Sequence, residues 1–151
     1  HVLRPGNNGY QAATLQNTEF WPDLELEDFQ RQRSIPPDIN HETVAGALLT
    51  AVSEINASLL AFVSKQQGAG YSTAAAVPGA KIEGVNELTA LYIRAVHARA
   101  KADLMGEFAA ISRQKENTNQ DAPQTKASLL AEAAVAIRRI KGLKRVGVHL
   151  I

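Results

Sequence analysis

The sequence predicts an all-α protein: an antiparallel helical bundle of three long helices plus a short N-terminal helix, with an extended N-terminal arm and a short C-terminal β-strand. Apolar residues recur at three- and four-residue steps over three long stretches, and Ala and Leu are abundant, as in amphipathic helices. Near the C-terminus Val146, Val148 and Leu150 instead alternate with smaller or polar residues, which predicts a strand. The length of 151 residues suits one domain.

The predicted elements divide the chain into an arm (1–19), a helical bundle domain (20–142) and a terminal strand segment (143–151). The arm contains Pro5, Gly6 and Gly9 and lacks a sustained periodicity, so we expect it to be extended or mobile. A short helix is expected from Leu26 to Arg33, with Leu26 and Phe29 buried. The segment Ser34-Ile35-Pro36-Pro37 ends it, because proline cannot continue the hydrogen-bond ladder.

The three long helices are expected at residues 41–67, 86–114 and 124–141, with Asn40 capping the first and Gly142 ending the third. The first stripe is Val44, Leu48, Val52, Ile55, Leu59 and Phe62. The second is Leu88, Leu91, Tyr92, Ala95, Val96, Ala102, Met105, Phe108 and Ile111, and the third is Leu129, Leu130, Ala133, Ala134, Ile137 and Ile140. Short polar connections, including a loop at 115–123, favour a common core.

Catalytic and metal-binding patterns are absent from the sequence. There is no cysteine, phosphate-binding glycine loop, dinucleotide fingerprint or nucleophile elbow. The four histidines include no pair at i and i+4, and His97 with Arg94 and Lys101 is expected to form a solvated basic face. We therefore expect no enzyme, no catalytic residue, no metal and no cofactor. The apolar run 44–63 contains Glu54 and Asn56, so no membrane contact is expected.

Charge is unevenly distributed although the net charge is only +1. Residues 1–80 carry four Lys/Arg against eight Asp/Glu, and residues 81–151 carry twelve against seven. The densest feature is a basic cluster, namely Arg138, Arg139, Lys141, Lys144 and Arg145. The end of a helix accounts for some of these cations, and the excess favours an acidic partner, either a protein or the phosphates of DNA. An overall pI of about 8.2 favours the protein.

Two further features point to contacts whose partner the sequence leaves open. Phe20 and Trp21 either anchor the arm across the helices, which the usual burial of paired aromatics favours, or form an exposed binding hot spot. The strand at Val146, Val148 and Leu150 needs hydrogen-bond partners. These come either from another chain by strand addition or from residues 1–19 of the same chain.

Five segments follow one another along the chain, namely Phe20-Trp21-Pro22-Asp23-Leu24, Leu26-Glu27-Asp28-Phe29, Ala51-Val52-Ser53-Glu54-Ile55-Asn56, Tyr92-Ile93-Arg94-Ala95-Val96 and Arg145-Val146-Gly147-Val148-His149-Leu150-Ile151. In these segments and their order, the chain resembles the small head completion proteins of contractile-tailed bacteriophages. The resemblance spans residues 19–151. Gly147 departs from the pattern, because a β-forming residue such as Thr is expected there.

The resemblance implies a head-tail connector subunit of the virion, assembled in the host cytoplasm. Such proteins form a homo-oligomeric ring of about twelve copies, whose heterologous contacts close on themselves. The ring lies below the portal protein, stabilises the DNA-filled head and offers a platform to neck and tail terminator proteins. The basic cluster would meet the portal or DNA in the channel. Reversal of Arg138 and Arg139 to Glu is expected to abolish portal binding while the domain stays folded.

Other functions remain open from the residues alone. A nucleic-acid-binding module of a DNA packaging complex would bind duplex DNA as an isolated monomer, with an affinity that falls steeply as salt rises. A self-associating bacterial scaffold unrelated to phage is a further alternative, and an enzyme lacks any supporting motif.

Overall fold

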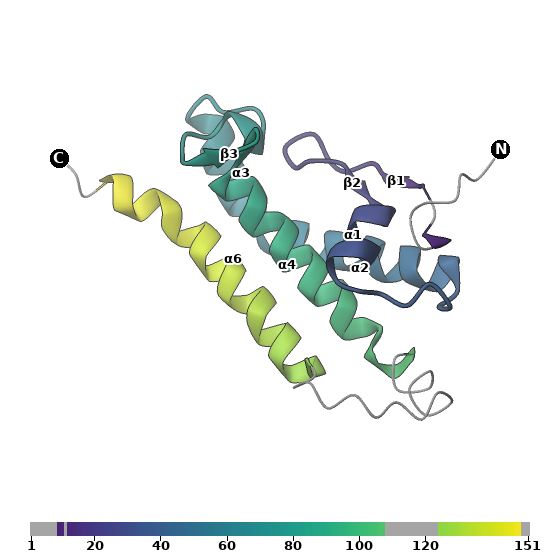
Figure 1. The fold of residues 1–151 in the computed structure, drawn as a ribbon. Helices are drawn as coiled ribbons and strands as arrows, with labels where there is room; N and C mark the ends of the chain where they lie inside the picture. The colour runs from purple at the N-terminus through teal and green to yellow at the C-terminus, as the bar shows by residue number, and fades with distance from the viewer. Residues whose placement is uncertain (1–8, 11, 108–123, 149–151) are drawn as a thin grey trace.

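A computed structural model describes residues 9–10, 12–107 and 124–148, with side-chain surroundings through residue 143. These residues are mostly helical, in agreement with the predicted all-α class, and include two small antiparallel sheets. The elements are β1 (Thr14–Leu15), β2 (Leu24–Glu25), α1 (Leu26–Gln32), α2 (His41–Ser58), α3 (Leu60–Gly68), the 3-10 helix η2 (Ala74–Ala76), β3 (Lys81–Ile82), β4 (Val85–Asn86), α4 (Glu87–Asp103) and α6 (Lys126–Val148). Helices α4 and α6 lie side by side and run in opposite directions (Figure 1).

The N-terminal segment is held against the helices in its described part. Strand β1 pairs with β2, with Thr14 opposite Glu25 and Leu15 opposite Leu24. The hydroxyl of buried Tyr10 donates to the Ile35 carbonyl oxygen at 2.9 Å. Residues 1–8 and 11 of the predicted arm lie outside the described residues. The predicted short helix is confirmed as α1, with Leu26 and Phe29 buried.

The first predicted long helix is wrong as a single element, because it is divided at Leu59 into α2 and α3, which bend by 61°. The Ser58 hydroxyl donates to the Ile55 carbonyl oxygen at 2.9 Å, a local bond that competes with the helix ladder. The Asn40 cap is confirmed, since its side chain accepts from the backbone N–H groups of Glu42 and Thr43. No single helix of the described residues is long and apolar enough for a membrane span; α2 and α3 meet that test only as a bent pair.

Helix α4 is the centre of the fold, with α2 packed on one side and α6 on another. Because neighbours cover several sides of α4, its buried residues include Ala98 and Ala100 as well as residues of the predicted stripe. Small side chains at Ala98, Ala102 and Ala133 pack with Leu129 and let α4 and α6 approach closely. Helix α4 ends earlier than predicted, at Asp103, and residues 105–107 are again helical. Phe108, Ile111 and the predicted loop at 115–123 lie outside the described residues.

The predicted C-terminal strand is wrong as far as Val148, because α6 continues through Gly142 to that residue. Gly142 lies inside the helix, and Leu143 packs partly buried against the core, which favours continued helix. Three residues of the third predicted stripe, Leu129, Ala133 and Ile140, are buried, whereas Ala134 is exposed. Leu150 and the rest of 149–151 lie outside the described residues.

An aromatic stack joins the N-terminal segment to the core. Trp21 is 4% exposed and stacks on Tyr92 with ring centroids 4.2 Å apart and an interplanar angle of 5°. The ring centroid of Trp21 also lies 4.8 Å from that of Phe20 and 6.4 Å from that of Phe62. These rings belong to the segment before β2, to α3 and to α4, so the stack ties three parts of the chain together.

A closed set of hydrogen bonds lies beside the stack. The Tyr92 hydroxyl donates to Asn56 Oδ1 at 2.6 Å and accepts from Asn17 Nδ2 at 2.9 Å, and Asn56 Nδ2 donates to Asn17 Oδ1 at 3.0 Å. Burial raises the pKa of Tyr92 to about 12, although both asparagine contacts oppose the rise. The neutral hydroxyl therefore stays available as donor and acceptor over the physiological pH range.

A hairpin that the sequence analysis missed precedes α4. Strand β3 pairs with β4, and the connection is the two residues Glu83 and Gly84, with φ angles of +50° and +81°. A type I′ turn requires a left-handed backbone conformation at both central residues, and this turn suits a tight hairpin. The stretch between α3 and α4 thus contains η2 and this hairpin.

Candidate partner-binding surface on helices α4 and α6

A charged cluster joins α1, α4 and α6 on one side of the molecule. The Glu132 carboxylate on α6 accepts from Arg33 Nη1 at 3.1 Å and Nη2 at 2.8 Å, a bidentate pair. Arg94 on α4 donates to the same carboxylate through Nε at 3.0 Å. Lys101 Nζ donates to the Arg33 carbonyl oxygen and to Gln124 Oε1, each at 2.9 Å. One carboxylate therefore holds two guanidinium groups in place.

The end of α1 positions Arg33 for this pairing. Ser34 adopts φ +53°, and the backbone N–H of Ile35 donates to the Gln30 carbonyl oxygen at 2.9 Å. The N–H of Ser34 reaches the Arg31 carbonyl oxygen at 3.4 Å, so α1 ends in a Schellman motif. This turn, which precedes the prolines credited with ending the helix, places the side chain of Arg33 between α4 and α6.

The excess of positive charge in the cluster affects the pKa values of its groups. The hydrogen bond that Glu132 accepts from Arg33 holds the pKa of its carboxyl group below the usual 4.5, although partial burial opposes the shift. Burial lowers the pKa of Lys101, and the nearby Arg33 lowers it further. A polar cavity of about 380 Å³ lies among Arg33, Arg94, Lys101, Gln124 and Glu132. These groups bind one another, so the cluster joins helices and holds Arg94 in a fixed position.

The expectation of a solvated basic face at His97 and Lys101 is wrong. His97 is 3% exposed and contacts the ring of Phe29 at 5.1 Å between centroids, and Lys101 is also buried. Only Arg94 of that trio has an exposed side chain. Burial lowers the pKa of His97 from 6.5 to about 4, and the charge of Arg33 adds to the shift.

Acid is expected to destabilise the protein through His97. Neutral His97 contributes stability that is present above pH 6.5 and is lost as the pH falls towards 4, because unfolded chains bind the proton first. Between pH 7 and pH 4.5 the free energy of unfolding should fall by about 2 kcal/mol more than in His97→Gln. Urea titrations of both proteins at both pH values measure this. Equal losses in the two proteins would contradict the assignment.

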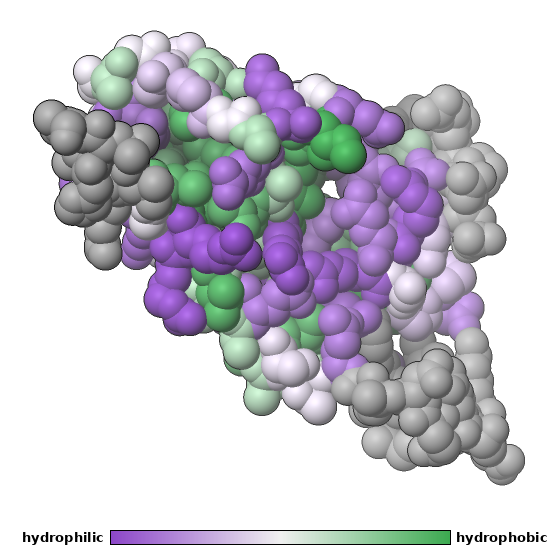
Figure 2. Space-filling view, turned by 60° about the vertical axis from the view of Figure 1, so that its left-hand side comes forward, coloured by the Kyte–Doolittle hydropathy of each residue, from purple (hydrophilic) through white to green (hydrophobic). Residues whose placement is uncertain are grey.

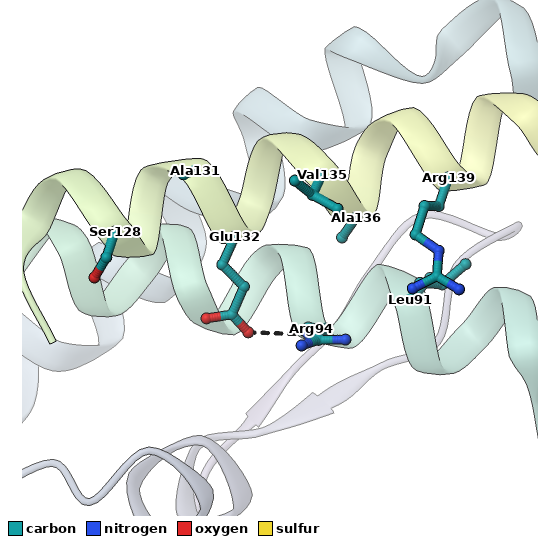
Figure 3. Close-up of a pocket in the computed structure, with 8 residues that line it drawn as sticks. All are labelled: Leu91, Arg94, Ser128, Ala131, Glu132, Val135, Ala136 and Arg139. Atoms are coloured by element: carbon teal, nitrogen blue, oxygen red, sulfur yellow. Dashed lines mark hydrogen bonds and ion pairs between the residues drawn. The ribbon is translucent and has the colours of Figure 1, made fainter.

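A groove lies beside the charged cluster, between α4 and α6 (Figure 3). Its volume is about 320 Å³. The apolar part includes Leu91, Val135 and Ala136, and the polar part includes Arg94, Glu132 and Arg139. Val135 is 43% exposed, so its apolar side chain is accessible in the groove. Figure 2 shows hydrophilic residues in a broad band over this side of the molecule, with hydrophobic residues visible between them. The groove can thus receive an aliphatic group that carries a nearby negative charge.

Helix α6 separates the predicted basic cluster into two positions. Arg138 and Lys141 are exposed and lie three residues apart, on the side of α6 opposite to buried Ala133, Ala136 and Ile140. Arg139 instead lines the groove. The backbone of Lys144 and Arg145 belongs to α6, and the side chains of both lie outside the described surroundings.

The other predicted contact residues are placed elsewhere. Phe20 and Trp21 are buried in the core. Val146 and Val148 have helical backbone, and Leu150 lies outside the described residues, so strand pairing with another chain through these residues stays a prediction. In the part of the chain that the structure describes, no group of His, Asp and Glu could hold a metal ion. Sequence reasoning missed Glu132 and the groove, whose residues come from segments nearly 40 residues apart. The signal that the sequence offered was Val135, an apolar residue outside the predicted stripe of its helix.

Comparison with known proteins identifies the family of this chain. Residues 15–151 match the model of the phage head completion protein (GPL) family. A probable head completion/stabilization protein of Haemophilus phage HP1 (strain HP1c1) is 36% identical over 142 residues, 94% of this chain and 95% of that protein. The head completion/stabilization protein of Escherichia phage P2 is 25% identical over 133 residues, 87% of this chain and 79% of that protein. No solved structure matches. The chain therefore belongs to the phage head completion protein family.

Proposed function

We propose that this chain is a structural, non-enzymatic subunit of the phage virion that forms a ring below the portal protein. The ring stabilises the DNA-filled head and provides the platform for neck and tail proteins. The names of the relatives in phages HP1 and P2, head completion and stabilization, support the role in the head. The subunit needs no cofactor for this role, and it assembles in the host cytoplasm before it becomes part of the virion.

The observation that carries the portal contact is the outward basic face of α6. Arg138 and Lys141 are exposed, and neither has an ion pair within the described residues. Two exposed alanines, Ala127 and Ala134, precede them at this side. Unpaired cations beside small side chains fit a flat acidic surface, which we assign to the portal.

Charge reversal on this face is expected to weaken portal binding. Arg138→Glu with Lys141→Glu should lower the affinity for purified portal rings by at least about tenfold, because like charges then face each other. Co-sedimentation at several salt concentrations measures the affinity. Arg139 is left unchanged, since it belongs to the groove.

The matched control reverses two exposed cations elsewhere, Lys65→Glu on α3 and Lys126→Glu at the start of α6. It changes the net charge equally and should leave portal binding within about twofold of the original value. An equal loss of portal binding in both double variants would contradict a specific role for the basic face of α6. If the original chain binds duplex DNA in a gel shift and does not bind portal rings, the nucleic-acid-binding alternative replaces the portal assignment.

A further inference from the structure

The hairpin β3–β4 presents an apolar pair to solvent. Ile82 and Val85 are directly paired across the strands, so their side chains lie on the same face. Ile82 is 76% exposed, more than any other large apolar residue in the described chain, and Val85 is 38% exposed. Between them Glu83 places an exposed carboxylate that has no ion pair within the described residues. The hairpin tip is therefore two aliphatic side chains around one negative charge.

The base of this hairpin is rigid. Asn86 Nδ2 donates to the carbonyl oxygens of Ala74 and Val77 at 2.8 and 2.9 Å, and its Oδ1 accepts from the Thr89 backbone N–H at 2.9 Å. The Glu87 N–H donates to the Ala80 carbonyl oxygen at 3.0 Å. A tip fixed in this way loses little conformational entropy when it binds. Within the described residues, the Ile82 side chain of this fixed tip stays largely exposed.

The groove between α4 and α6 has the complementary character. Leu91 and the half-exposed Val135 provide apolar contact, and Arg139 at its edge has no ion pair within the described residues. Arg94 uses Nε for Glu132, so the outer end of its guanidinium also faces the groove (Figure 3). A carboxylate at the edge would therefore meet two arginines.

We propose that the groove between α4 and α6 receives the tip Ile82–Val85 of a second copy of this chain. Ile82 and Val85 would cover Val135 and Leu91, and the Glu83 carboxylate would pair with Arg139 beside Arg94. The tip and the groove are different surfaces, so successive copies join head to tail, the contact type that closes a ring. This contact rests on the proposed function, because it requires copies of the chain to assemble side by side in a ring.

Cysteine pairing tests the contact, because the natural chain contains no cysteine. Full-length chains with Ile82→Cys are mixed with chains of different mass carrying Val135→Cys under mild oxidation. The mixed disulfide dimer should dominate over either like-with-like dimer. The control is Leu60→Cys on α3, since Leu60 is apolar and 65% exposed but belongs to neither surface. Mixed dimers formed equally well by Leu60→Cys would overturn the contact.

A charge exchange provides the second readout. Glu83→Arg in the Ile82→Cys chain should reduce the mixed dimer at least about tenfold, because it faces Arg139 and Arg94. Arg139→Glu in the Val135→Cys chain should restore most of it. Both changes are at exposed positions, so thermal unfolding of each variant should match that of its parent. Absence of rescue in folded variants would contradict the assigned ion pair.

The same cysteine pair in assembled heads separates this contact from the proposed function. Heads that carry the chain at the portal vertex but form no bond between positions 82 and 135 overturn the contact and leave the proposed function intact. Heads without the chain at that vertex overturn the proposed function, even where purified chains form the mixed dimer. A double-cysteine chain should yield disulfide ladders beyond the dimer. A product that stops at the dimer would contradict head-to-tail joining.

Discussion

Replacing Trp21 with Ala is expected to destabilise the protein by about 3–5 kcal/mol, the range for truncating a buried aromatic residue. Trp21 is almost fully buried and contacts the rings of Phe20, Phe62 and Tyr92. Its loss leaves a cavity where the N-terminal segment, α3 and α4 meet. For a chain of this length the thermal midpoint should fall by about 10 °C. Urea titration and thermal unfolding by circular dichroism measure both quantities.

Two controls accompany the tryptophan variant. Trp21→Phe retains a ring against Tyr92 and should lose less than half as much stability as Trp21→Ala. Leu60→Ala removes an exposed apolar side chain and should change the free energy of unfolding by less than about 0.5 kcal/mol. A loss below about 1 kcal/mol in Trp21→Ala would show that the N-terminal segment is not joined to the core in this way.

Replacing Asn86 with Ala is expected to cost about 3 kcal/mol, because one buried side chain serves three backbone groups. Asn86 is 2% exposed, caps α4 through the Thr89 N–H, and satisfies the carbonyl oxygens of Ala74 and Val77. Those two carbonyl groups would be left without this donor. The same substitution should also weaken the disulfide between positions 82 and 135, because the hairpin loses its fixed base.

Asn40 provides the matched comparison for Asn86. Asn40 is exposed and caps α2 by accepting from two backbone N–H groups, but its side chain donates to no carbonyl oxygen in the described structure. Asn40→Ala should therefore cost only about 1 kcal/mol. Urea titration of both variants measures the difference. Similar losses in the two variants would mean that Asn86 acts only as a helix cap.

Helices were predictable from the sequence where a repeated apolar pattern meets a local capping signal. The stripe from Val44 to Phe62 and the Asn40 cap are both confirmed. The break at Leu59 was not predictable, since the apolar steps continue unchanged from Ile55 through Leu59 to Phe62. A periodic apolar pattern in the sequence indicates which side of a helix faces the core, but it does not indicate where the helix changes direction. The hydroxyl bond of Ser58 that accompanies the bend depends on the packed structure.

The wrong strand at the C-terminus shows the limit of a short period-two pattern. Val146 and Val148 alternate with Arg145 and Gly147, yet the backbone is helical. The preceding Ala-rich turns already form a helix packed on α4, and extending a helix costs less than starting a new element. Gly142 gave a false stop signal, because its position has no left-handed φ.

The site was predictable only in part, since its charge pairs join distant segments. The basic cluster was evident in the sequence, but its division between an outward face and a groove depends on the side of α6 that packs on α4. The pairing of Arg33 with Glu132 joins residues 99 positions apart. The hairpin carried a weak signal: Lys81-Ile82 and Val85-Asn86 flank the two residues Glu83-Gly84, which lack the Asn-Gly or Asp-Gly usual in type I′ turns.

Electron microscopy of DNA-filled heads tests most directly whether this chain is a ring subunit at the portal. Heads are purified with the original chain and compared with heads assembled in its absence. We predict a closed ring of density directly below the portal, present only with the chain, into which α4 and α6 fit with the basic face of α6 towards the portal. Identical portal vertices in both kinds of head, or the chain bound elsewhere on the head, would contradict that role.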